Sequence, residues 1–272
     1  MLASAARRTL RLPLVVGMLF GGLFTVTVLF PFSREGFRRA AIRRWSRMLL
    51  WCCGLQLREH PGPGARPLGE LPRGRMLVAN HISWVDIFAI NALCPASFVA
   101  KAEIARWPLI GTLVARTGTL FIERGKRRAV HRMIEHIGRN LEAGGRVAVF
   151  PEGTTGDGRC LLPFHANLVQ AAVEARIDVV PAGVRYVDTR GARTQAIDYI
   201  GDINFVESLW RILGAGGLCC EVHPLEPIPG DAGLSRHDVA ERARAAIAAR
   251  LAVPLQDEMP ERIRAIRAPR AG

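Results

Sequence analysis

His81 and Asp86 are side chains whose types and spacing suit acid–base chemistry. They lie in the segment Asn80–Asp86, directly after an apolar run. Five positions along one helix turn through about 500°, so two side chains at this spacing would point roughly 140° apart. The pair can meet only if His81 lies on a loop and Asp86 lies one turn into a helix. Asp86 would then accept from one imidazole nitrogen while the other takes a proton from a substrate hydroxyl.

Further polar residues follow two other apolar runs. Residues 147–150 are apolar and lead into Glu152, Gly153 and Thr154. The apolar run at 119–122 ends beside Arg124, whose guanidinium suits bidentate contact with an anion. If these runs are parallel strands, the polar groups face the His81 pair at the carboxyl edge of one sheet.

Short apolar runs alternate with helical patterns through this part of the chain. The patterns predict strands at 76–79, 98–101, 119–122, 146–150, 179–187 and 218–222. They predict helices at 84–93, 108–115, 127–142, 164–175 and 235–251. Such alternation indicates an α/β fold with a mostly parallel central sheet and helices on both faces.

The first 58 residues have a different character. Leu12–Phe32 carries no charge and is about long enough to cross a bilayer, and no small-x-small cleavage site follows it. On a helical wheel, residues 37–49 place Phe37 and Trp45 on an apolar arc opposite four arginines, which is typical of a helix in the headgroup layer. The alternative is an amphipathic helix docked on the core. We expect a membrane anchor and interfacial helix over 1–58 and one catalytic domain over 59–272.

The distribution of charge points to a lipid surface. The net charge is +13, and residues 1–50 hold nine arginines against Glu35 alone, beside the uncharged run. This favours anionic lipid over nucleic acid as a partner. If residues 12–32 span the inner membrane, the excess of arginine after them places the catalytic domain on the cytoplasmic side. A hairpin that enters one leaflet would leave it there too.

No metal site is expected. The six cysteines form no Cys-x-x-Cys pair, so neither a zinc site nor a disulfide framework is indicated. His81, Asp86 and Glu152 lack the spacing of a metal triad.

Together these segments resemble the glycerolipid acyltransferase family, whose best-known members are the 1-acylglycerol-3-phosphate acyltransferases. The resemblance covers roughly residues 75–190, and Lys101 lies in a matching stretch between its first two blocks. Four blocks appear in the expected order: Asn80-His81 to Asp86; Gly118 with Phe121-Ile122 and Arg124; Phe150 to Thr154; and Val180-Pro181 ahead of Gly183-Val184.

The resemblance implies transfer of a fatty acyl group from acyl-CoA or acyl-acyl carrier protein to a lysolipid hydroxyl. The first expected acceptor is 1-acylglycerol-3-phosphate, which would give phosphatidic acid. His81 would be the general base and Asp86 its partner, with the acceptor bound by Lys101, Arg124 and the Glu152-Gly153-Thr154 turn. A thioester is already activated, so no cofactor is expected beyond this co-substrate. We expect backbone N–H groups at the helix start after His81 to form the oxyanion site.

Two departures from the family pattern keep alternatives open. Thr155 stands where many relatives have Arg, and His165 stands where Lys is usual. Residues 152–158 also resemble members that acylate lyso-ornithine lipid, which is the alternative acceptor. A non-catalytic lipid-binding protein of the same fold is the other alternative. A serine hydrolase is disfavoured because no Gly-x-Ser-x-Gly motif is present.

Overall fold

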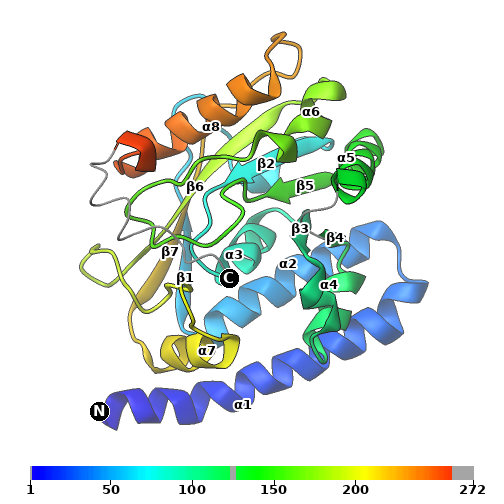
Figure 1. Cartoon of the computed structure of the whole chain (residues 1–272). Coiled ribbons are helices and arrows are strands. Elements are labelled where there is room, and N and C mark those ends of the chain that lie inside the picture. The colour runs from blue at the N-terminus through cyan, green and yellow to red at the C-terminus, as the bar shows by residue number, and fades with distance from the viewer. Residues whose placement is uncertain (1, 123–126, 259–272) are drawn as a thin grey trace.

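A seven-stranded sheet forms the centre of the computed structural model, which describes residues 2–122 and 127–258 (Figure 1). The strand order is β1-β7-β6-β2-β5-β3-β4, and every neighbouring pair is parallel except β6 and β7. The predicted α/β fold with a mostly parallel sheet is thereby confirmed. The strands are β1 Leu55–Glu59, β2 Arg75–Ala79, β3 Ser97–Lys101, β4 Leu120–Ile122, β5 Arg146–Val149, β6 Val179–Val187 and β7 Leu218–Pro224.

The strand β1 was not predicted. It is a five-residue edge strand that pairs in parallel with β7, from Leu55 opposite Leu218 to Glu59 opposite Val222. Four of its five residues, 55–58, fall in the segment assigned to the anchor and interfacial helix. The sheet therefore begins before the boundary expected at residue 58.

Four helices lie where the sequence predicts them: α3 Val85–Leu93, α4 Ile110–Arg116, α5 Arg127–Glu142 and α8 Arg236–Leu251. The helix expected at 164–175 is a 3₁₀ turn, Ala166–Leu168, followed by the short α6, Gln170–Glu174. The helix α7, Phe205–Gly214, was missed. Its start carries a local signal, because the Asn204 side chain accepts a hydrogen bond from the backbone N–H of Glu207.

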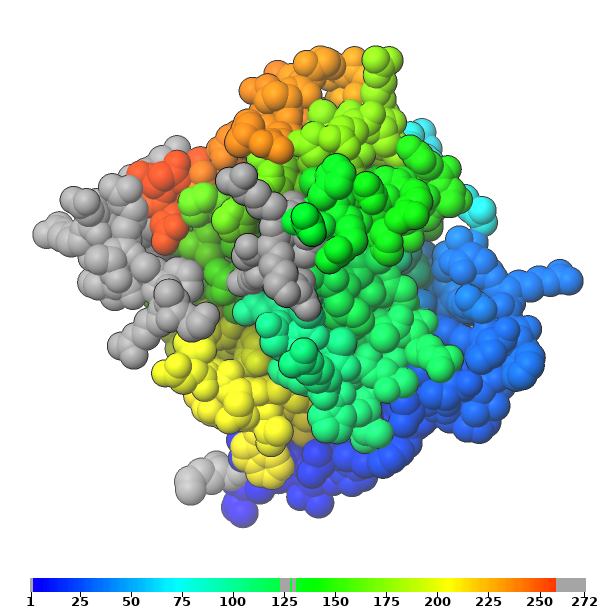
Figure 2. All heavy atoms as spheres, turned by 45° about the vertical axis from the view of Figure 1, so that its right-hand side comes forward, coloured from blue at the N-terminus to red at the C-terminus, as the bar shows by residue number. Residues whose placement is uncertain are grey.

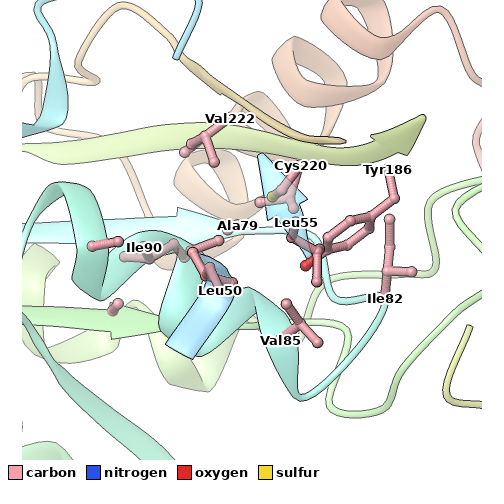
Figure 3. Close-up of a cluster of buried hydrophobic side chains, with 14 of the residues drawn as sticks. Leu50, Leu55, Ala79, Ile82, Val85, Ile90, Tyr186, Cys220 and Val222 are labelled. Carbon is pink, nitrogen blue, oxygen red and sulfur yellow. The ribbon is translucent and has the colours of Figure 1, made fainter. Parts of the chain in front are cut away.

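Two apolar cores lie on opposite faces of the sheet. Side chains of α3, α7 and the helix α2, Glu35–Cys52, pack on one face (Figures 1 and 3). Side chains of α5, α6 and α8 pack on the other. The strands β2 and β6 lie at the centre, which makes the loops after them a firm base for functional groups.

The N-terminal helix α1, Leu2–Phe24, continues through a π turn, Thr25–Leu29, and a 3₁₀ turn, Phe30–Phe32. By length and composition alone, residues 2–32 are apolar enough to cross a membrane. In the structure α1 packs along the domain, where it contacts α7, α2 and α4 (Figures 1 and 2).

Three arginines attach α1 to the end of α7. Arg7 donates to the carbonyl of Gly214 at 3.2 Å, Arg8 to that of Trp210 at 3.1 Å and Arg11 to that of Leu213 at 3.1 Å. The last carbonyls of a helix lack partners within it and carry partial negative charge, so guanidinium groups stabilise them. These arginines therefore hold α1 on the domain, in addition to contributing to the positive charge of the N-terminal segment.

The helix α2 is docked on the domain along one side. Its residues Ser46, Leu49 and Leu50 are buried. Arg43 and Arg47 donate to the carbonyls of Leu93 and Ala92 at the end of α3. The structure therefore favours the docked alternative for these two arginines, because their guanidinium groups bind the last carbonyls of α3.

Candidate active site

His81 and Asp86 meet as their spacing predicts. His81 lies on the loop after β2, and Asp86 lies in the first turn of α3. The imidazole Nδ1 and the carboxylate Oδ2 are 2.8 Å apart. With the proton on Nδ1, Nε2 is left as a proton acceptor, which is the arrangement that a general base requires.

Asp86 is fully buried, and its carboxylate has four donors. Besides Nδ1 of His81, Oδ2 accepts from the backbone N–H groups of Ile82 at 2.7 Å and Ser83 at 2.9 Å. The other oxygen, Oδ1, accepts from the hydroxyl of Tyr186 at 2.6 Å. The N–H groups of Ile82 and Ser83, which precede α3, are therefore directed at Asp86. An oxyanion site formed by N–H groups at the helix start stays a prediction.

Glu152 joins the loop after β5 to the loop that carries His81. Its Oε1 accepts from the backbone N–H of His81 at 2.7 Å, and its Oε2 accepts from that of Leu162 at 3.1 Å. Burial raises the pKa of this carboxyl to about 8, against the opposing effect of the two N–H donors. Contact of Glu152 with an acceptor headgroup stays a prediction, since both oxygens have backbone partners here.

The aromatic ring of Phe150 was part of the sequence motif, but no role was predicted for it. It stacks on the imidazole of His81, with centroids 4.1 Å apart and planes inclined by 9°. Phe98 stacks behind it, with the ring centroids 5.7 Å apart. The stacked rings limit rotation of the imidazole about its Cβ–Cγ bond.

Three of the remaining predicted site residues, Gly153, Thr154 and Lys101, line the same cavity as His81. Gly153 has φ +68°, a conformation that favours glycine, and with Thr154 it lines the cavity beside His81. Lys101 is exposed at the end of β3 and also lines the cavity. Arg124 lies outside the described residues. Thr155 donates its hydroxyl to the carbonyl of Tyr199, which connects the turn to the loop before α7.

The cavity is large and mostly apolar. Its volume is about 2790 Å³, and it runs from His81 to the space between α1, α2 and α4. Leu19, Ile42 and Leu113 are among the apolar side chains that line its far part. A polar reaction centre at one end and an apolar interior at the other suit an amphipathic substrate.

Comparison with known proteins accords with this geometry. Residues 69–185 match the family model described as Acyltransferase. The lyso-ornithine lipid O-acyltransferase of Pseudomonas aeruginosa is 40% identical over 184 residues, which cover 67% of this chain and 70% of the relative. The chain belongs to the acyltransferase family.

Other acyltransferase relatives carry two different names. The 1-acyl-sn-glycerol-3-phosphate acyltransferase of Neisseria gonorrhoeae is 41% identical over 157 residues, 58% of this chain. That match spans 61% of the relative's length. The lyso-ornithine lipid O-acyltransferase of Brucella abortus is 31% identical over 276 residues, which cover 93% of this chain and 98% of the relative.

A solved acyltransferase structure shares the fold. The crystal structure of the 1-acyl-sn-glycerophosphate acyltransferase from Thermotoga maritima aligns with a TM-score of 0.63 and 20% identity, covering 90% of this chain and 96% of that one. The match to the acyltransferase family model contains His81, Asp86, Phe150 and Glu152, and it ends one residue before Tyr186.

Proposed function

We propose that this protein transfers a fatty acyl group from acyl-CoA or acyl-acyl carrier protein to the free hydroxyl of a lysolipid. The acceptor is 1-acylglycerol-3-phosphate and the product phosphatidic acid. The observation that carries the proposal is the His81–Asp86 pair, 2.8 Å apart, at the polar end of a large apolar cavity. The names of the relatives at 40–41% identity support the same chemistry.

The reaction needs one proton acceptor, and both substrates must be held with the lysolipid hydroxyl next to the thioester carbonyl carbon. Nε2 of His81 takes the proton as the hydroxyl oxygen of the lysolipid attacks the thioester carbonyl carbon. The negatively charged Asp86 stabilises the imidazolium that results. The tetrahedral intermediate then collapses, the C–S bond breaks, and His81 gives its proton to the departing sulfur. The products are a lipid ester and a free thiol.

The cavity would hold the fatty chains while this step takes place. Its apolar lining favours burial of hydrocarbon, which is worth about 0.8 kcal/mol for each methylene removed from water. Several methylenes of each chain can therefore contribute to substrate binding. The charged headgroup and the hydroxyl would stay at the polar end, close to His81.

The protein would reach its lipid substrate at the cytoplasmic face of the inner membrane. Apolar side chains exposed on the N-terminal helices include Leu10, Leu14, Phe20, Phe24, Val28, Phe32, Phe37, Met48 and Trp51. Val206 and Trp210 of α7 are exposed as well. Because arginines hold α1 along the domain, we infer that these helices enter one leaflet rather than cross the bilayer.

The deciding experiment supplies purified protein with labelled acyl-CoA or acyl-acyl carrier protein and a panel of lysolipids. We expect labelled phosphatidic acid from 1-acylglycerol-3-phosphate and no product from the His81→Ala variant. Formation of no ester from any lysolipid would leave the non-catalytic lipid-binding alternative in its place.

Lyso-ornithine lipid is the second candidate acceptor. Two observations favour it: relatives with that name match over the larger shares of their length, and Thr155 brings no cation to the turn where a phosphate would bind. Both lysolipids are offered in one vessel. A kcat/KM that favours lyso-ornithine lipid by tenfold or more would replace the acceptor and keep the acyltransferase chemistry.

A further inference from the structure

Tyr186 is a buried residue of β6 that lies in the same hydrogen-bonded group as His81. Its side chain is 2% exposed and packs beside Cys220 of β7, close to Ile82 and Val85 (Figure 3). Its hydroxyl donates to Oδ1 of Asp86 at 2.6 Å, while Oδ2 of the same carboxylate contacts Nδ1 of His81 at 2.8 Å. One carboxylate therefore connects a phenol to an imidazole.

The carboxylate depends on these donors because solvent does not reach it. Asp86 is 0% exposed, and its Oδ2 already has three donors from the loop after β2. The other oxygen of Asp86, Oδ1, accepts a hydrogen bond from the Tyr186 hydroxyl, the side-chain donor found there among residues 2–122 and 127–258. A buried acceptor that loses its partner keeps the full cost of desolvation. The phenol thus shares the negative charge that also acts on His81 and on the N–H groups of Ile82 and Ser83.

We propose that Tyr186 is a positioning residue that sets the orientation and basicity of His81 through Asp86. The proposal rests on the proposed role of His81 as general base. By drawing charge toward Oδ1, the phenol weakens the attraction of Asp86 for imidazolium and keeps more of His81 in the free base form. By fixing Oδ1, it also fixes the plane of the carboxylate and hence the direction of Nε2.

The other titratable groups near Tyr186, Asp86 and His81 do not change the basicity of His81 in the same way. Burial raises the pKa values of Tyr186 and of Cys220 well above their usual range, so both stay neutral. Glu152 faces His81 from the loop after β5, and Arg244 of α8 acts on Glu152. Burial raises the pKa of Glu152 to about 8, so this carboxyl can titrate in the pH range of the assay. All variants to be compared keep Glu152, so its titration does not account for differences between their pH profiles.

The first test is Tyr186→Phe, which removes the hydroxyl and keeps the ring. We expect kcat to fall about tenfold, since hydrogen bonds to charged groups are the stronger ones, with KM for both substrates unchanged. The acid limb of the kcat/KM–pH profile should move to higher pH. A profile that superimposes on that of the wild type would overturn the proposal and leave Tyr186 a packing residue.

The second test strengthens the same hydrogen bond. The chain has two tyrosines, so biosynthetic replacement by 3-fluorotyrosine in a Tyr199→Phe background changes Tyr186 alone. A fluorinated phenol is more acidic and a stronger donor. We expect the acid limb to move to lower pH than in the unfluorinated Tyr199→Phe protein, opposite to the effect of Tyr186→Phe. Shifts of the same sign in both proteins would contradict the proposal, and this test remains if Tyr186→Phe fails to fold.

The matched control is Ser208→Ala. Ser208 is buried in the same core and accepts a hydrogen bond from Nε1 of Trp84 at 3.0 Å, without contact with Asp86. We expect this variant to lose stability with no shift of the pH profile. A shift as large as that of Tyr186→Phe would mean that the profile reports general loosening of the core.

A readout that needs no turnover separates this inference from the proposed function. Diethyl pyrocarbonate modifies neutral imidazole, and mass spectrometry of the peptide that contains His81 gives its rate at each pH. Tyr186→Phe should move the pH at half-maximal rate upward and 3-fluorotyrosine should move it downward. If these shifts occur in a protein without transferase activity, the proposed function fails and the coupling stands. Their absence in an active enzyme overturns the coupling alone.

Discussion

The backbone N–H of His81 donates to Oε1 of Glu152 at 2.7 Å, across a sequence separation of 71 residues. The second oxygen of the same carboxylate accepts from Leu162. A buried carboxylate with two backbone donors ties three segments together, because each N–H would otherwise need a different partner. The loop that carries the proposed base is therefore held from the β5 side by Glu152 and from the α3 side by Asp86.

Replacement of His81 by Ala should abolish acyl transfer and leave the fold intact. A positioned general base contributes roughly 10²–10⁴ in rate. The imidazole is 18% exposed and stacks on Phe150, so we expect a lower melting temperature but a folded protein. Rate assays at saturating substrate and a melting curve check the two parts. A folded variant that keeps more than about a tenth of wild-type kcat would remove His81 from the mechanism.

Replacement of Phe150 by Leu should lower kcat more than it changes KM. The ring stacks on His81, and aromatic pairs contribute about 0.5–1.5 kcal/mol, so we expect a decrease of roughly 2- to 10-fold. The control is Phe98→Leu, which removes the next of the stacked rings and leaves the ring on His81 in place. An equal loss of kcat in both variants would assign the effect to packing of the core.

Stability should fall as the pH rises from about 4.5 toward 8, through the titration of Glu152. The carboxyl has a pKa of about 8 in the folded protein and an ordinary one near 4.5 when unfolded, so the folded state binds the extra proton between these values. A raised folded pKa contributes stability at low pH that is lost as the group ionises. Chemical unfolding at a series of pH values should show this slope in the wild type and a flatter one in Glu152→Gln. An equal slope in both proteins would assign it to other groups.

Binding to lipid vesicles should depend on the exposed apolar side chains of the N-terminal helices. Replacing Phe20, Phe24 and Val28 by Ser should lower vesicle partition by at least tenfold, because each side chain that leaves hydrocarbon costs on the order of 1.5–3 kcal/mol. The melting temperature should stay close to that of the wild type, since these side chains are exposed.

The electrostatic contribution to membrane binding is tested separately. High salt screens arginine–lipid contacts but leaves apolar insertion intact, so 1 M salt (about a 3 Å Debye length) should not release the wild-type protein. Arg39→Gln should weaken only the salt-sensitive part of binding. Full release by salt alone would show that charge, and not insertion, holds the protein on the membrane.

Arg124→Ala should raise KM for 1-acylglycerol-3-phosphate far more than KM for the thioester. Thr155 carries no charge, so Arg124 is expected from the sequence to make the main phosphate contact. Loss of a charge-assisted hydrogen bond of about 1.5–3 kcal/mol corresponds to roughly 10- to 150-fold. Equal changes in the two KM values would argue against headgroup recognition by this residue.

The sequence predicted those contacts of the site that form between residues close together in the chain. The His81–Asp86 contact follows from a strand end, a short loop and a first helical turn within seven residues. The contact from Tyr186 could not be found in this way, because it joins residues 100 positions apart and depends on burial in β6. The family match also stops short of it.

The difference between local and long-range contacts also explains which strands could be predicted. Six strands have apolar runs strong enough to identify, whereas β1 alternates at the edge of the sheet and is defined by its pairing with β7. Glu152 was identified as a polar residue at the right edge, but its two backbone partners lie in separate loops. Residue type shows that a group can do chemistry; which partners occupy it depends on the folded chain.

The arginine contacts between α1 and α7 fix the N-terminal helix relative to the domain. Arg8 also lies over the ring of Trp210 at 4.7 Å, and Phe205 at the other end of α7 packs on Trp84, three residues after His81. If α1 rests among lipid chains as proposed, this rigid series holds the imidazole at one height relative to the bilayer. The enzyme would then choose among hydroxyl groups by where they stand along the lipid, in addition to the headgroup that each lipid carries.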